Sequence, residues 1–158
     1  MTTQISCDKT ELKKNDTALY TVQINTDKPV DSAVIEVFPS VESYPDTLII
    51  PDADSVKAEN NLQANAAIGE NGIFTITLSD TGENTSVSVS FTASSTGFAD
   101  KNTSAASVTA YRNGASYEAY SQVSVNGSSV MPLFTGIAAA VLTAAAGILF
   151  YRIFLHSR

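Results

Sequence analysis

The chain has 158 residues and a formal net charge of −7, with 9 Lys and Arg against 16 Asp and Glu. Its one cysteine, Cys7, excludes an intramolecular disulfide framework and a cysteine-based zinc cage. Its one histidine, His156, excludes His-pair metal sites and most His-dependent catalytic triads. An acidic chain without a basic patch is a poor nucleic-acid binder. The composition therefore argues against enzyme, metalloprotein and DNA-binding functions, and we expect no cofactor and no nucleic-acid partner.

Short strand-like segments follow one another from the N-terminus, each bounded by turn residues. In chain order they are Gln4–Cys7, Ala18–Asn25, Ser32–Phe38, Thr47–Ile50, Gly72–Ser79, Ser86–Ser94, Ser104–Tyr111 and Tyr117–Val125. Ser86–Ser94 alternates most cleanly, with apolar residues on one face and serines on the other, whereas Ser32–Phe38 is apolar on both faces apart from Glu36. The polar stretch 51–70 is interpreted as a loop that crosses between sheets. The pattern predicts an all-β fold, a two-sheet Ig-like or jelly-roll sandwich over residues 1–125.

Residues 130–151 contain no charged side chain. As a helix they would extend about 33 Å, enough to span a hydrocarbon core of about 30 Å. A buried core helix is the alternative, but such a helix rarely lacks a polar face over this length. We therefore predict a short hinge at 126–129 and a single C-terminal transmembrane helix. Small residues spaced by four favour close helix–helix packing in the bilayer; they are Gly136, Ala140 and Ala144 on one row and Ala139, Thr143 and Gly147 on another.

The charges beside this span predict its orientation. Arg152 and Arg158 place the tail 152–158 in the cytoplasm by the positive-inside rule, and the N-terminal domain outside. The first residues resemble no secretory leader, which leaves three explanations open: a fragment or processed form, a misplaced gene start, or a tail-anchored protein that faces the cytosol. The last would translocate both arginines. The predicted location is the cell membrane, single-pass, with the N-terminal domain at the cell surface.

No catalytic constellation is visible in the sequence: there is no Gly-x-Ser-x-Gly elbow, and no Gly-rich phosphate loop follows a strand. Asp46, Asp52 and Asp54 cluster, and the last two could offer oxygens to Ca²⁺. The segment lacks the spaced ligand series of an EF-hand, so it is interpreted as a solvated acidic loop, and we predict no metal site. Cys7 ends a short strand and is predicted to be a half-buried structural thiol.

Four Asn-x-Ser/Thr sequons are candidate N-glycosylation sites at accessible loop positions, if the host glycosylates exported protein. They lie at Asn15, Asn84, Asn102 and Asn126. The alternative is that these are turn asparagines that happen to precede Ser and Thr.

The opening CDKTELKKNDTALYTVQIN resembles the first two strands of prokaryotic surface Ig-like modules, in which a D-K and a G/N-D pair precede an alternating strand. Asp8, Lys9, Asn15 and Asp16 match that pattern. Over residues 3–127 the order of features is similar to that of cohesins: SAVIEVF, a Tyr/Pro/Asp turn at 44–46, a Leu-containing strand, GIFTITLSDTG, then SVSVSFTAS. The Tyr-Pro-Asp order differs from the usual Tyr-Asp-Pro of cohesins.

The resemblance implies a non-catalytic sandwich in which one flat sheet face binds a small, helical, calcium-loaded dockerin. The outward residues implied for that face are Glu36, Thr75, Thr77, Ser88 and Ser90. A solvated sheet face explains the same residues.

The sequence as a whole predicts a membrane-anchored surface module that presents its sandwich to an extracellular protein or glycan ligand. Two alternatives stay open. The chain is an accessory subunit of a larger membrane complex, packed through its small-residue rows, or it is the passive stalk domain of a surface-layer or adhesin protein.

External protease applied to intact cells should remove residues 1–129, because the basic tail keeps the C-terminus inside. Immunoblotting of the shaved cells, with Cys7 labelled by a thiol reagent under mild denaturation, measures this. A domain that stays protected until the cells are lysed would show a tail-anchored protein facing the cytosol.

Overall fold

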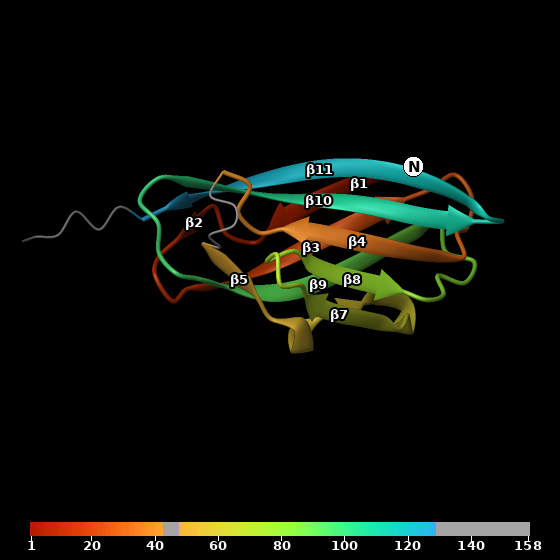
Figure 1. Cartoon of the computed structure of the whole chain (residues 1–158), viewed down its shortest axis with the longest axis horizontal. Coiled ribbons are helices and arrows are strands. Elements are labelled where there is room, and N and C mark those ends of the chain that lie inside the picture. Colours follow the sequence, from red (N-terminus) through yellow and green to blue (C-terminus); the bar gives the residue numbers. More distant parts are fainter. Residues whose placement is uncertain (43–47, 129–158) are drawn as a thin grey trace, which may run out of the picture. The chain divides into compact units, whose positions relative to one another are not determined.

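Two β-sheets make up the part of the chain that the computed structural model describes, residues 1–42 and 48–128 (Figure 1). These residues belong to one unit, Met1–Ser128. Among the described residues no helix is both long and apolar enough to cross a membrane. The predicted transmembrane helix, its small-residue rows at Gly136, Ala140, Ala144 and Gly147, and the tail 152–158 lie outside the described residues.

The first sheet has five strands, all paired antiparallel. Its order is β1 (Thr2–Cys7), β3 (Thr17–Asn25), β9 (Ser86–Ser95) and β5 (Ile49–Pro51), and β6 (Lys57–Ala58) also pairs with β9. In this register Tyr20 of β3 lies opposite Cys7 on one side and Phe91 on the other.

The second sheet has six strands. Its order is β2 (Glu11–Leu12), β11 (Ala115–Gly127), β10 (Lys101–Arg112), β4 (Ser32–Phe38), β8 (Phe74–Leu78) and β7 (Ala64–Ile68), with β2 parallel to β11 and every other pair antiparallel. Asn113 and Gly114 join the two longest strands at φ of 51° and 77°. Two consecutive positive φ angles are those of a two-residue hairpin whose twist matches the strands, which explains why this Asn-Gly pair is found there.

The hydrophobic core lies between the two sheets, and the predicted alternation is confirmed. Each alternating segment buries its apolar set: Tyr20, Val22 and Ile24 on β3, Phe74, Ile76 and Leu78 on β8, and Val87, Val89, Phe91 and Ala93 on β9. Phe91 stacks on Tyr20, with ring centroids 5.6 Å apart, and meets Phe74 of the other sheet edge-on at 5.0 Å. This aromatic trio joins the sheets at the centre of the core.

The stretch 51–70 differs from the predicted loop. It does cross between the sheets, but it also contains η1 (Ala53–Ser55), β6, η2 (Glu59–Asn61) and β7. These elements were missed because two are single 3-10 turns, β6 has two residues, and β7 has Ala and Asn at all its positions except Ile68. At the other end, β11 continues through Gly127, two residues into the predicted hinge.

Phe91→Ala should lower the free energy of unfolding by about 3–5 kcal/mol, because it leaves a cavity between Tyr20 and Phe74. Phe91→Leu keeps most of the volume and should cost less than about 1.5 kcal/mol. Urea denaturation followed by circular dichroism measures both. Tyr120→Ala, at a side chain 57% exposed, is the control and should change stability by less than about 0.5 kcal/mol. Equal losses in all three variants would contradict a core centred on Phe91.

Candidate binding face

The outer face of the six-stranded sheet is built by the period-2 alternation of its strands. On β4, Ile35 and Val37 are buried, so Glu36 and Phe38 point away from the core. The register places Glu36 opposite Thr75 on one side and Ser107 on the other. Ser107 in turn lies opposite Tyr120. Four strands thus contribute side chains to one continuous outer face.

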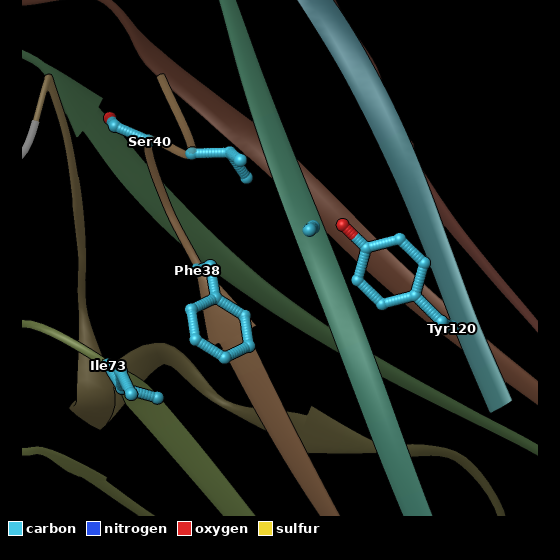
Figure 2. A pocket seen from close by; sticks show the side chains of 6 residues that line it. Phe38, Ser40, Ile73 and Tyr120 are labelled. Atoms are coloured by element: carbon cyan, nitrogen blue, oxygen red, sulfur yellow. The ribbon is translucent and has the colours of Figure 1, made fainter. Parts of the chain in front are cut away.

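A cavity of about 510 Å³ opens on this face. It is lined by Phe38, Ser40, Val41, Ile73, Ala105 and Tyr120. Figure 2 shows the rings of Phe38 and Tyr120 on either side of β10, with Ile73 beyond Phe38. We call this the Phe38–Tyr120 pocket.

The small side chain of Ala105 lies between the two rings and is 1% exposed, whereas Tyr120 is 57% exposed. The pocket therefore has a buried apolar floor and an exposed aromatic wall. That combination suits an apolar group inserted from outside, because such a group would cover surface that water now contacts.

Buried hydrogen bonds hold the rim of the pocket where β4 ends. The Asn102 amide donates to the Pro39 carbonyl at 2.9 Å, and the Ser104 hydroxyl donates to the same carbonyl at 2.8 Å. Val41 is held by a backbone hydrogen bond, in which its amide donates to the Thr103 carbonyl at 2.9 Å. The rim is thus set by β10 rather than left as a free loop.

Acidic side chains surround the Phe38–Tyr120 pocket. Glu36 and Glu118 are exposed, and each lies two residues from a pocket ring on its own strand. Glu42 follows Val41 and accepts a hydrogen bond from the Thr103 amide at 3.0 Å. Hydrogen bonding to Thr103, chiefly to its side chain and also to its backbone amide, lowers the pKa of the Glu42 carboxyl. The strands that form this face, β4, β8, β10 and β11, contain two cationic residues, Lys101 and Arg112, at the two ends of β10. The acidic surroundings of the pocket therefore favour a cationic partner.

The five residues implied for a binding face are divided between the sheets. Glu36, Thr75 and Thr77 lie on the outer face of the six-stranded sheet, the face on which the Phe38–Tyr120 pocket opens. Ser88 and Ser90 belong to β9 of the five-stranded sheet. One face containing all five is therefore not formed, because alternation shows which residues point outward but not which sheet a strand joins.

The sequence reasoning missed the aromatic rings of the pocket. Phe38 ends a strand that is apolar on both faces, and Tyr120 alternates with small and polar residues along β11. For Tyr120, the available signal was an aromatic residue on the polar side of its strand, between Glu118 and Gln122.

The sequons have different surroundings. Asn102 is buried, 1% exposed, with its amide bonded to Pro39, so the expectation of an accessible loop position was wrong there. Asn15 is exposed in a turn at φ 68°, and Asn126 is exposed on β11. The amide of half-buried Asn84 donates to the Thr81 carbonyl at 2.8 Å. Glycosylation at the last three stays a prediction.

The acidic segment serves local structure in the described residues. The Asp52 carboxylate accepts a hydrogen bond from the Asp54 amide at 3.1 Å and so caps η1. Nowhere in 1–42 and 48–128 do three side chains of His, Cys, Asp or Glu gather as metal ligands. Asp46 lies outside the described residues.

Cys7 is half-buried, as predicted. It faces the core beside Tyr20, its partner across the strands. Burial raises the pKa of the Cys7 thiol and also raises the pKa of the Tyr20 phenol. Both groups are therefore neutral at physiological pH, as a structural role requires.

The fold is similar to those of a bacterial pilin and of bacterial and archaeal cohesins. Domains D2 and D3 of the major pilin SpaD from Corynebacterium diphtheriae superpose with a TM-score of 0.59 at 15% identity, over 77% of this chain and 51% of that structure. A type II cohesin domain from Acetivibrio cellulolyticus superposes with a TM-score of 0.56 at 12% identity, over 78% of this chain and 94% of that structure. A non-cellulosomal cohesin from Archaeoglobus fulgidus superposes with a TM-score of 0.52 at 16% identity, over 77% of this chain and 91% of that structure.

These similarities confirm the predicted resemblance to Ig-like and cohesin-like β-sandwich modules at the level of the fold. The chain spans about half the length of the two-domain pilin structure. No family model and no curated protein sequence matches the chain.

Cys7 should react with iodoacetamide more slowly in the folded protein than in urea, and its rate should rise with pH through a midpoint above that of an ordinary thiol. The cause is desolvation of the thiolate by the core. The unfolded chain then loses its proton at lower pH than the folded chain, so Cys7 destabilises the fold as the pH rises above the ordinary thiol value. In Cys7→Ser, that part of the alkaline loss of stability should disappear. A native alkylation profile identical to that in urea would contradict this burial.

Proposed function

We propose that this chain is a non-catalytic, membrane-anchored cell-surface module that binds an extracellular protein through the outer face of its six-stranded sheet. The Phe38–Tyr120 pocket carries the proposal. It combines an apolar floor, an exposed tyrosine and a surrounding set of carboxylates, on a face that the sandwich leaves open to solvent.

The chemistry of the face defines the partner. A cavity of about 510 Å³ can receive one large apolar side chain, such as Leu, Met or Phe, as the anchor of an interface. Glu36, Glu42 and Glu118 favour Lys or Arg beside that anchor, because opposite charges speed the encounter and disfavour other partners. The partner is thus a protein segment with an apolar residue flanked by basic residues.

The similarity to cohesins supports a dockerin as one such partner, and the similarity to a pilin supports a role in a surface assembly. Both rest on fold alone, and fold does not determine function. The Phe38–Tyr120 pocket is the feature of this chain's own residues that favours binding over a passive stalk. The uncharged stretch 130–151 supports membrane anchoring, with the sandwich outside and the basic tail inside.

The full chain in mild detergent should bind either a calcium-loaded dockerin from a panel or peptides with a central Leu, Met or Phe flanked by Lys and Arg. Matched peptides flanked by Asp and Glu should bind more weakly, and added salt should weaken the basic peptides most. Tyr120→Ala and Phe38→Ala should each lower the affinity at least about tenfold, as loss of an interface anchor does. Isothermal titration calorimetry measures all of these.

Tyr111→Ala is the matched control. Tyr111 is also exposed, 41%, on the outer side of β10, but it lies six residues from Ala105, roughly 20 Å away along the strand. The Tyr111→Ala variant should bind the peptides with the affinity of the unchanged chain. Equal losses in the Tyr111 and Tyr120 variants would contradict the pocket as the binding site. Binding of glycans alone would replace the protein partner, and the absence of any binding would favour the stalk function.

A further inference from the structure

The outer edge of β7 is open to strand pairing. β7, Ala64–Ile68, is the last strand of the six-stranded sheet and pairs with β8 (Figure 1). The Gly69 amide donates to the Ile73 carbonyl at 2.9 Å in the turn between them. Because hydrogen-bonded pairs alternate along an antiparallel ladder, the backbones of Asn65 and Ala67 bond to β8. The N–H and C=O groups of Ala64, Ala66 and Ile68 then point away from the sheet.

Within the described residues, β8 is the only strand that pairs with β7. η1 lies close to β7, but no backbone hydrogen bond joins the two in residues 1–42 and 48–128. Ala67 and Ile68 are exposed, the latter 49%. Outward backbone groups of this kind form a template for another strand.

The other sheet edges carry devices that discourage pairing. β2 has two residues and includes Glu11, and β5 and β6 are short and contain Pro51 and Lys57. β1 lies against β11. Charged residues, proline and short strands are the means by which natural sheets protect their edges. β7, ANAAI, contains neither a charged residue nor a proline.

We propose that β7 pairs with β7 of a second copy of this chain, antiparallel and around a two-fold axis at Ala66. In that register Ala66 lies opposite its own copy, and Ala64 lies opposite Ile68. The three residues with outward backbone groups then form one Ala66–Ala66 pair and two Ala64–Ile68 pairs across the junction. Each pair exchanges two hydrogen bonds, about six in all. The two six-stranded sheets become one continuous sheet.

The side chains at this junction are compatible with the same register. Each exposed Ile68 packs beside the small Ala64 of the other copy, and Asn65 lies opposite Ala67. No like charges meet across the junction, although the chain is acidic overall. Because an interface is self-complementary around a two-fold axis, one strand supplies both halves. The area is small, so the dimer is weak and forms at high local concentration.

Disulfide trapping tests the register with the full chain in mild detergent. The Cys7→Ser background removes the native thiol, and Ala66→Cys then places two thiols on the two-fold axis. Opposed residues of a hydrogen-bonded pair have Cα atoms about 5.5 Å apart, within the range of a disulfide. Mild oxidation should give a covalent dimer. Ser116→Cys, at an exposed position of β11, is the control and should stay monomeric. Equal yields from the two variants would overturn the register.

Sedimentation velocity tests the association without a cross-link. The fraction of dimer should rise with protein concentration. Ile68→Lys should weaken the association at least about tenfold, because it replaces the apolar contact with Ala64 of the other copy by a hydrated cation at each end of the junction. Ile50→Lys is the matched control, because Ile50 is 50% exposed on β5 of the other sheet, and it should dimerise as the unchanged chain does. The proposal is overturned if the chain stays monomeric, if the two lysine variants behave alike, or if only Gly136→Leu in the predicted span abolishes the dimer.

Discussion

The aromatic contact between the sheets is the constraint on which the rest of the structure depends. Phe91 stacks on Tyr20 within the five-stranded sheet and meets Phe74 of the six-stranded sheet at 5.0 Å. Because successive side chains point to opposite faces, burying these three rings decides the direction of every other side chain on their strands. It also sends Thr75 and Thr77 of β8, and Glu36 of the neighbouring β4, to the outside. The candidate binding face follows from the way the core is filled.

The second constraint is polar. The Pro39 carbonyl accepts hydrogen bonds from both Asn102 and Ser104 inside the protein, so the chain leaves β4 along a defined path toward Ser40 and Val41. Buried polar groups of this kind tend to specify a structure rather than add stability. Here they hold the rim of the Phe38–Tyr120 pocket against β10. The same bonds explain why Asn102, a sequon asparagine, is unavailable to a glycosylating enzyme in the folded domain.

The alternation of apolar and polar residues in the sequence predicted most of the long strands. The alternation of Ser86–Ser94 predicted a strand with one apolar face, and β9 buries that face in the core. Ser32–Phe38, apolar on both faces apart from Glu36, is β4, which lies between β10 and β8. Pairing between strands is not local, and for that reason Glu36 and Ser88 could be predicted to point outward but not to lie on different sheets. The pocket could not be predicted from the sequence for the same reason, since the register of three strands brings Phe38 and Tyr120 to either side of Ala105. β7 was missed because four of its five side chains are Ala or Asn, which give no strand signal of their own.

The measurement that tests the central claim most directly is amide hydrogen exchange of the full chain with and without its tightest-binding peptide or dockerin. The account predicts slowed exchange around Phe38–Val41, Ala105 and Tyr120, with the five-stranded sheet unchanged. Protection centred on β9 around Ser88 and Ser90 would contradict it, because the ligand would then occupy the other side of the sandwich.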